Sequence, residues 1–249
     1  MPQPRKPATS QVPIIAIAGT KGGGGKTTVC VHLAARLGTT SRPCIVADLD
    51  PQAAATSWLL PEAPPDGFNL AHDLEAGRPM RTLPAPGVPG VRVAPGHLDL
   101  SAWDGGDART RARLAVTLRP AEPAACVLAD LPPSWGAILA GTVLASDGVL
   151  AVVECRALGL AGLSPLLDLI ERAGGRLLGV VPSRRGRTRL AREVEEHLRE
   201  RFQCLTTIRE AAAVAEAVAD GRTVAADHPA AQDFHDLAAA VRRALKGRL

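Results

Sequence analysis

Two lysines flank a run of four glycines near the start of the chain. Residues 19–28 read Gly-Thr-Lys-Gly-Gly-Gly-Gly-Lys-Thr-Thr, directly after an apolar stretch. Glycine backbones can curl around an anion because they carry no Cβ, and a following helix N-terminus adds partial positive charge. In such a loop Lys26 would reach the β- and γ-phosphates, and the Thr27 hydroxyl would bind Mg2+. The predicted phosphate-binding residues are Lys21, Gly22, Gly23, Gly24, Gly25, Lys26, Thr27 and Thr28.

The loop departs from the common G-x-x-x-x-G-K-[ST] pattern at its first position. Thr20 stands where that pattern has glycine, and Lys21 follows it. The whole chain has only four lysines, and two of them lie in this loop. Because phosphoryl transfer needs extra positive charge on the γ-phosphate, we predict that Lys21 and Lys26 both act in catalysis.

Three carboxylates follow predicted buried strands. The apolar run 44–47 ends in Asp48 and Asp50, and the run 125–129 ends in Asp130. Carboxylates at the carboxyl ends of strands beside the phosphate-loop strand face the nucleotide crevice of an open α/β sheet. A carboxylate at the position of Asp130 typically holds Mg2+, usually through water. We therefore expect a magnesium site at this edge of the sheet.

Apolar strands alternate with helical patterns along the rest of the chain, which predicts the elements that position these residues. The expected strands are 12–18, 44–47, 125–129, 148–153, 177–182 and 204–208, and residues 91–100 are expected to form a strand and turn. The expected helices are 29–37, 70–76, 108–118, 159–173, 190–202 and 230–246. This alternation is typical of an α/β fold with a doubly wound, mostly parallel sheet and helices on both faces.

Three motifs together resemble the ParA/MinD family of P-loop ATPases, and most of all the short ParA-type partition proteins. They are the loop from Lys21 to Thr28, the sequence Asp48-Leu49-Asp50-Pro51-Gln52 and the sequence Asp130-Leu131-Pro132-Pro133-Ser134. The resemblance implies that Lys21 reaches the ATP of a second subunit. It also implies that Asp50 orients the attacking water as a catalytic residue, and that Thr27, Asp48, Asp50 and Asp130 serve the metal.

The resemblance also implies an activity. We expect a slow, Mg2+-dependent ATPase whose ATP-bound homodimer binds DNA without sequence preference. A ParB-like partner would stimulate hydrolysis, and the output would be segregation or positioning of a chromosome or plasmid. The implied location is the cytoplasm, on the nucleoid.

An arginine-rich segment follows the predicted strand 177–182. Residues 172–192 hold seven arginines and no acidic residue. Arginines without interleaved aromatic residues suit contacts with phosphates rather than with bases. The predicted DNA-binding residues are Arg184, Arg185, Arg187, Arg189 and Arg192.

Other parts of the chain leave alternatives open. The resemblance implies an adenine-side proline and a DNA-contacting arginine where this chain has Arg209 and Glu210, so either the DNA surface is partly rebuilt or DNA affinity is low. The basic C-terminal helix could serve as a membrane anchor, as in MinD-like relatives, although its apolar residues more simply pack on the sheet. A metal-cluster or metabolic ATPase is a third alternative, but neither Cys126 nor Cys155 has the loop setting of a cluster ligand.

Length and composition fit a single globular domain. The 249 residues are 46% hydrophobic and carry a formal net charge of +4. We expect a disordered tail at 1–11 and one P-loop domain at 12–249, with no apolar run of transmembrane length. Five cysteines without C-x-x-C spacing are expected to be reduced core residues.

Overall fold

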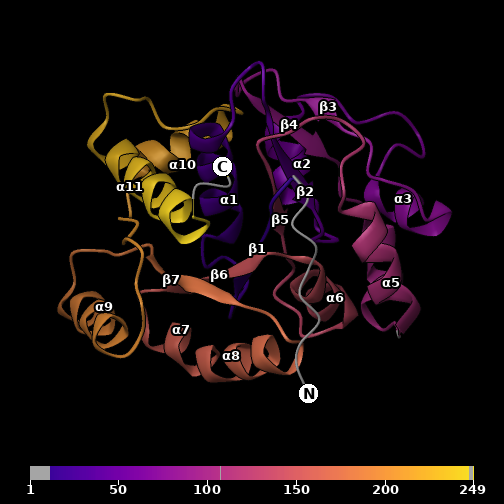
Figure 1. The fold of residues 1–249 in the computed structure, drawn as a ribbon. Coiled ribbons are helices and arrows are strands. Elements are labelled where there is room, and N and C mark those ends of the chain that lie inside the picture. The colour runs from indigo at the N-terminus through magenta and orange to yellow at the C-terminus, as the bar shows by residue number, and fades with distance from the viewer. Residues whose placement is uncertain (1–11, 107, 247–248) are drawn as a thin grey trace.

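A seven-stranded sheet forms the centre of the molecule (Figure 1). The computed structural model describes residues 12–106, 108–246 and 249. The strand order is β3-β4-β2-β5-β1-β6-β7, and every neighbouring pair is parallel except β3 with β4. The strands are β1 (Ile14–Gly19), β2 (Cys44–Asp48), β3 (Leu83–Pro84), β4 (Val91–Ala94), β5 (Cys126–Asp130), β6 (Gly148–Glu154) and β7 (Leu177–Ser183). The predicted fold class is confirmed.

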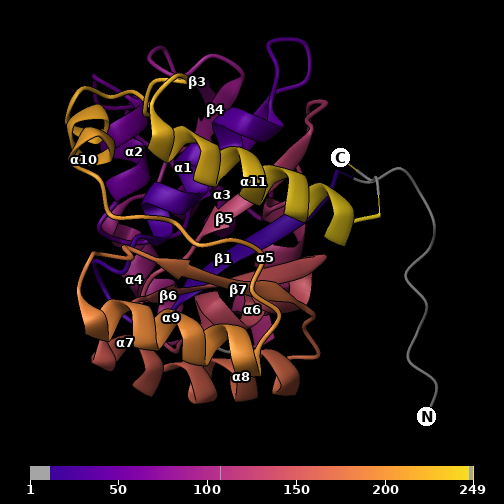
Figure 2. The ribbon, with the colours of Figure 1, turned by 90° about the vertical axis from the view of Figure 1, so that its left-hand side faces the viewer.

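Helices cover both faces of the sheet (Figures 1 and 2). One face packs against α1 (Lys26–Leu37), α2 (Ala54–Leu59), α10 (Ala212–Ala219) and α11 (Pro229–Ala244). The other packs against α3 (Leu70–Ala76), α5 (Ala108–Thr117), α6 (Ala137–Ala145), α8 (Leu163–Arg172) and α9 (Arg189–Arg201). The short elements η1 (Leu98–Leu100), α4 (Ser101–Asp104) and α7 (Ala157–Ala161) complete the fold.

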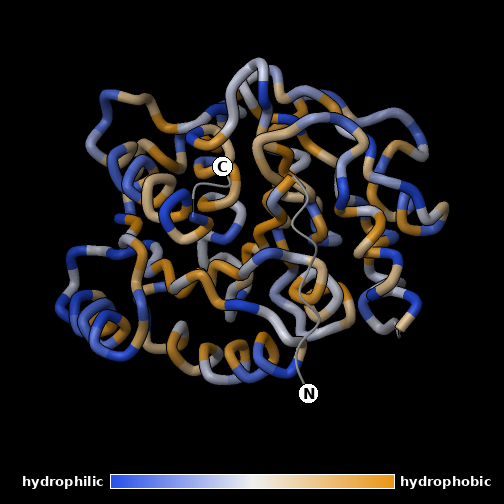
Figure 3. The backbone as a smooth tube through the Cα atoms, viewed as in Figure 1, coloured by the Kyte–Doolittle hydropathy of each residue, from blue (hydrophilic) through white to orange (hydrophobic). Residues whose placement is uncertain are grey.

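The strands are apolar throughout because both of their faces are covered. Along β1, Ile15 and Ile17 enter one core, whereas Ile14, Ala16 and Ala18 enter the other. Figure 3 shows apolar colour along the central strands, polar colour along the outer loops, and alternating colours along the helices. This two-sided burial fixes the sheet, and with it the positions of the residues at the carboxyl ends of its strands.

Two predicted elements differ in the structure. The predicted strand 204–208 is wrong: this segment runs beside β7 but pairs with it only as an isolated bridge between Cys204 and Val180, because Pro182 on β7 has no N–H to continue a ladder. The predicted helix 159–173 is divided into α7 and α8 at Gly162. Pro165 explains this break, because it cannot donate the hydrogen bond that would join its turn to Ala161. The predicted tail at 1–11 lies outside the described residues.

The C-terminal helix packs on the protein core. The apolar side chains of Phe234, Leu237 and Val241 on α11, and of Leu245 directly after it, are fully or almost fully buried and belong to the core that includes α1. This packing confirms the core role expected for the helix and leaves these four side chains unavailable to lipid. Among the described residues, no helix has the length and apolarity needed to cross a bilayer. All five cysteines are free thiols, and four are buried.

A buried histidine joins α1 to the segment before α11. The His32 ring stacks on Phe234 at 4.2 Å between centroids and meets the edge of Trp58 at 5.4 Å. Its Nδ1 lies 2.9 Å from the Thr28 carbonyl oxygen, and its Nε2 accepts a hydrogen bond from the Val224 N–H at 3.1 Å. These partners require a neutral ring with its proton on Nδ1. Burial lowers the pKa of His32 to about 4.

This pKa predicts a loss of stability in acid. The unfolded chain binds a proton at His32 near pH 6.5 and the folded chain only near pH 4, so stability is full above 6.5 and falls as pH decreases through this window. The loss amounts to roughly 3 kcal/mol, at about 1.4 kcal/mol per pKa unit. Urea unfolding of the wild type and of His32→Gln at pH 7.5 and 4.5 measures it. A wild-type loss no larger than that of the variant would contradict the prediction.

Candidate nucleotide-binding site

A pocket of about 570 Å³ opens where the glycine loop joins β1 to α1. β1 lies between β5 and β6 in the interior of the sheet, where chain connections diverge to either side. Ligands of open α/β sheets bind at this switch point, outside the carboxyl ends of the strands. The lining includes predicted phosphate-binding residues, Gly22, Gly23, Gly25, Lys26, Thr27 and Thr28, together with Asp50. The structure thus gathers these residues around one cavity.

Two glycines of the loop are required by close packing. Gly25 has a φ of 92°, and a Cβ there would lie 2.5 Å from the Ser183 hydroxyl oxygen. A Cβ on Gly19 would lie 2.8 Å from the Lys26 side chain. These glycines allow the loop to pack against β7 and allow Lys26 to cross the end of β1.

The two lysines have different environments. Lys26 is buried, and its Nζ donates a hydrogen bond to the Lys21 carbonyl oxygen at 3.2 Å. Burial lowers the pKa of Lys26, although Asp130 and Asp50 oppose this shift. Lys21 is exposed, and it is not among the residues that line the pocket of its own chain. Its backbone therefore supports Lys26 while its ammonium group remains outside.

Asp130 and Thr27 form the part of the site best suited to a divalent cation. The Thr27 hydroxyl donates to Asp130 Oδ2 at 2.6 Å, and Asp130 Oδ1 is buried without a hydrogen-bond partner among the described residues. Burial, and then the nearby Asp48, raise the pKa of Asp130 to about 7. A cation would satisfy the unpaired oxygen and favour the ionised carboxylate. No group of three or more His, Cys, Asp or Glu side chains converges on a metal position within the described residues, so other ligands would be phosphate or water oxygens.

Asp48 and Asp50 differ in what they contact. Asp48 is fully buried, and its Oδ2 accepts hydrogen bonds from both the backbone N–H and the hydroxyl of Thr56 at 2.7 Å. Burial raises the pKa of Asp48 to about 6. Its carboxylate thus holds the start of α2, whereas Asp50 lines the pocket and its side chain accepts a hydrogen bond from the Gln52 N–H at 2.9 Å. A metal role for either residue stays a prediction.

Sequence reasoning placed the adenine side near Arg209, but it did not name the apolar residues that form one wall of the pocket. This wall is largely apolar and comes from the segment before α10 and from α10 itself, through Ile208, Ala211, Val214, Ala215 and Val218. An apolar slot beside a phosphate loop suits the flat face of a base. The short alanine-rich pattern of 211–219 was the available signal.

The arginines of the arginine-rich segment lie in two different environments. Arg184 lines the nucleotide pocket, where it donates to the Gly23 carbonyl oxygen at 2.9 Å. Arg185 pairs with Glu195, and Arg189 with Glu193. Arg187 and Arg192 are exposed and have no ion pair with a described carboxylate. The structure therefore separates Arg184 from the outward-facing arginines of the α9 region.

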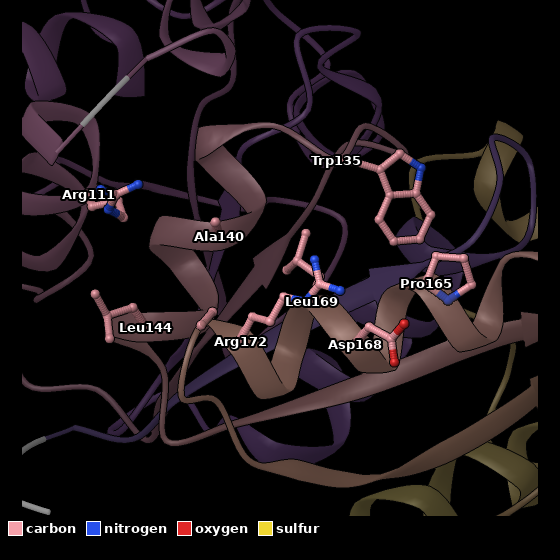
Figure 4. Close-up of a pocket in the computed structure, with 9 residues that line it drawn as sticks. Arg111, Trp135, Ala140, Leu144, Pro165, Asp168, Leu169 and Arg172 are labelled. Carbon is pink, nitrogen blue, oxygen red and sulfur yellow. The ribbon is translucent and has the colours of Figure 1, made fainter.

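A second pocket, of about 740 Å³, lies between α5, α6 and α8 (Figure 4). Its lining includes Trp135, Leu144 and Leu169, together with Arg111 and Arg172. None of the predicted phosphate-binding or metal residues lines it. The chemistry predicted from the sequence therefore belongs to the smaller pocket.

Comparisons with known proteins agree with the predicted family. A family model described as an AAA domain matches residues 12–177. The chain is 36% identical over 231 residues to the chromosome-partitioning ATPase Soj of Thermus thermophilus, covering 89% of this chain and 90% of that protein. It is 32% identical over 171 residues to the chromosome partitioning protein ParA of Caulobacter vibrioides, covering 66% of this chain and 64% of the relative.

Solved structures share the fold. A plasmid partition protein of Borrelia burgdorferi bound to AMPPNP superposes with a TM-score of 0.83 at 18% identity, over 94% of this chain and 99% of that one. McdA from Cyanothece, without nucleotide, gives 0.79 at 21% identity, over 94% and 99% of the two chains. With its glycine loop, its strand-end carboxylates and its relatives, the chain belongs to the ParA-type family of P-loop ATPases.

Proposed function

We propose that this chain is an ATP-dependent dimerisation switch that binds DNA without sequence preference and segregates or positions chromosomal or plasmid DNA with a ParB-like partner. One observation supports the switch most directly: Lys21 is exposed and outside its own pocket, whereas Lys26 lines that pocket. A loop lysine that faces outward is placed to neutralise the phosphates of a second copy. Hydrolysis would then require the dimer, which accounts for slow turnover in isolated subunits.

Under this proposal, Gly22 to Thr28 bind the phosphates and the apolar α10 wall holds the base. Thr27 and Asp130 would hold Mg2+, and Asp50 would orient the attacking water from the pocket wall. The metal supplies charge neutralisation on the phosphates when it is bound. Structures of a Mycobacterium smegmatis cobyrinic acid a,c-diamide synthase contain ADP or an ATP analogue with magnesium, which supports both ligands for this fold.

DNA binding would depend on the outward-facing arginines Arg187, Arg189 and Arg192, since Arg184 contacts the glycine loop. ATP would join two such surfaces in one dimer, and doubling the positive charge raises affinity for phosphates steeply. Binding to bulk DNA would place the protein on the nucleoid. A membrane role has little support, because the apolar side chains of α11 are buried.

Gel shifts with plasmid DNA and no nucleotide, ADP, ATP or a slowly hydrolysed ATP analogue test this function. We expect binding with ATP and the analogue only. Changing Arg187, Arg189 and Arg192 together to alanine should weaken binding and make the slope of log K against log salt shallower by about 0.9 for each phosphate that the variant no longer neutralises. The control is Arg222→Ala, an exposed arginine paired with Asp220. DNA binding that ignores nucleotide, or an unchanged salt slope, would contradict the proposal.

A further inference from the structure

The end of β7 and the residue that follows it hold two consecutive carbonyl groups of the glycine loop. The buried Ser183 hydroxyl donates to the Gly24 carbonyl oxygen at 2.7 Å, and Arg184 Nη1 donates to the Gly23 carbonyl oxygen at 2.9 Å. In a planar trans peptide the N–H of the next residue points opposite to the carbonyl. Holding these carbonyls toward β7 therefore directs the Gly24 and Gly25 amides away from it.

Arg184 is itself held from two sides. Its Nη2 donates to Glu210 Oε1 at 3.0 Å, and its Nη1 lies 3.6 Å from Glu154 Oε1. Arg156 joins the same group, 3.1 Å from Glu154 Oε1. Arg184 also has a φ of 50°, a backbone region that costs a non-glycine residue energy and persists where surrounding contacts require it. Together these interactions orient one guanidinium group toward the glycine loop.

The neighbouring residue carries this arrangement to α9. The Arg185 N–H donates to the Ile208 carbonyl oxygen at 3.1 Å, and the Glu210 N–H donates to the Arg185 carbonyl oxygen at 3.2 Å. The Arg185 side chain pairs with Glu195 on α9 at 3.3 Å. These three consecutive residues, 183–185, therefore contact the glycine loop, the segment 208–210 before α10, and α9.

We propose that Arg184, oriented by Glu210, is a positioning residue for the phosphate-binding loop, and that residues 183–185 couple nucleotide binding to the α9 arginines. The coupling half rests on the proposed function. When ATP holds the glycine loop in one conformation, the hydrogen bonds from Ser183 and Arg184 hold residues 183–185 in place. The ion pair between Arg185 and Glu195 then holds α9. Coupling of this kind is reciprocal, so DNA raises ATP affinity by the factor by which ATP raises DNA affinity.

Four variants test the positioning role with Mg-ATP as the probe. Arg184→Ala removes a charged donor and should raise the ATP Kd about tenfold, while Arg184→Lys, which keeps one donor, should recover part of it. Glu210→Gln should give a smaller increase. Adding Glu210→Gln to Arg184→Ala should cost nothing further, because Glu210 acts through Arg184. Arg222→Ala is the matched control and should bind ATP as the wild type does.

Three results would each overturn a part of the proposal. An ATP Kd for Arg184→Ala within twofold of the wild type removes the positioning role, and additive losses in the double variant remove the role of Glu210. The coupling is read from the ratio of ATP Kd values with and without random-sequence duplex DNA. This ratio should approach one in Arg184→Ala, and a wild-type ratio there would refute coupling. If no variant binds DNA in any nucleotide state, the proposed function fails while the ATP measurements still decide the positioning role.

Discussion

Lys21→Ala is expected to lower ATP hydrolysis by about 10³-fold, the lower range for losing a transition-state cation supplied in trans, while ATP binds nearly as before. The structure explains why binding should survive. Lys26 uses only the backbone carbonyl of Lys21, and alanine keeps that carbonyl. The lost ammonium group is exposed and does not line the pocket of its own chain.

Single-turnover hydrolysis and calorimetric titration with ATP measure the two quantities separately. Lys26→Ala is the contrasting control, because that buried lysine lines the pocket and its loss should reduce ATP binding itself.

Mixing Lys21→Ala with Asp50→Ala gives a sharper test. Heterodimers of the two contain one site with an intact Asp50 and a Lys21 from the other subunit, so activity should return in part. Unchanged turnover in Lys21→Ala, or no recovery on mixing, would refute a lysine that acts between subunits.

Asp130→Asn is expected to remove most of the Mg2+ contribution to ATP binding and its dependence on pH. Burial raises the pKa of Asp130 to about 7, and a protonated carboxyl group is a poor ligand for Mg2+. Wild-type affinity for Mg-ATP should therefore rise about tenfold per pH unit up to about 7 and level off above it. The variant, which cannot ionise, should show a flat profile and little difference between Mg2+ and EDTA.

In the protein without nucleotide, Asp130→Asn is expected to increase stability against unfolding. The folded pKa lies above the unfolded value of 3.8, so the stability that Asp130 contributes is present in acid and lost as pH rises through about 7. Asp130→Asn should therefore unfold at a higher temperature than the wild type at pH 8, with a smaller difference at pH 5. Asp227→Asn, at an exposed site, is the control. A wild type that is more stable than Asp130→Asn at pH 8 without nucleotide would contradict the assigned burial cost.

The glycine loop could be predicted from the sequence alone. Its lysines, glycines and threonines lie next to one another in the chain, so their chemistry is a local property, and the strands that flank the site are continuous apolar runs covered on both faces. Asp48 and Asp130 were also predictable as neighbours, because each ends a buried strand and they are paired in register between β2 and β5. The sequence did not indicate that Asp48 would be held by Thr56.

The amino-acid sequence determined the fold class, the phosphate loop and the strand-end carboxylates of this protein, because short-range spacing and two-sided burial encode all three. Only the tertiary structure decided which arginines face outward. Arg184 was grouped with its neighbours by sequence, yet it contacts Gly23 and Glu210, which are 161 and 26 positions away. Contacts at such separations depend on how β7, the glycine loop and the α10 wall pack together, and composition or periodicity within one segment does not encode that packing.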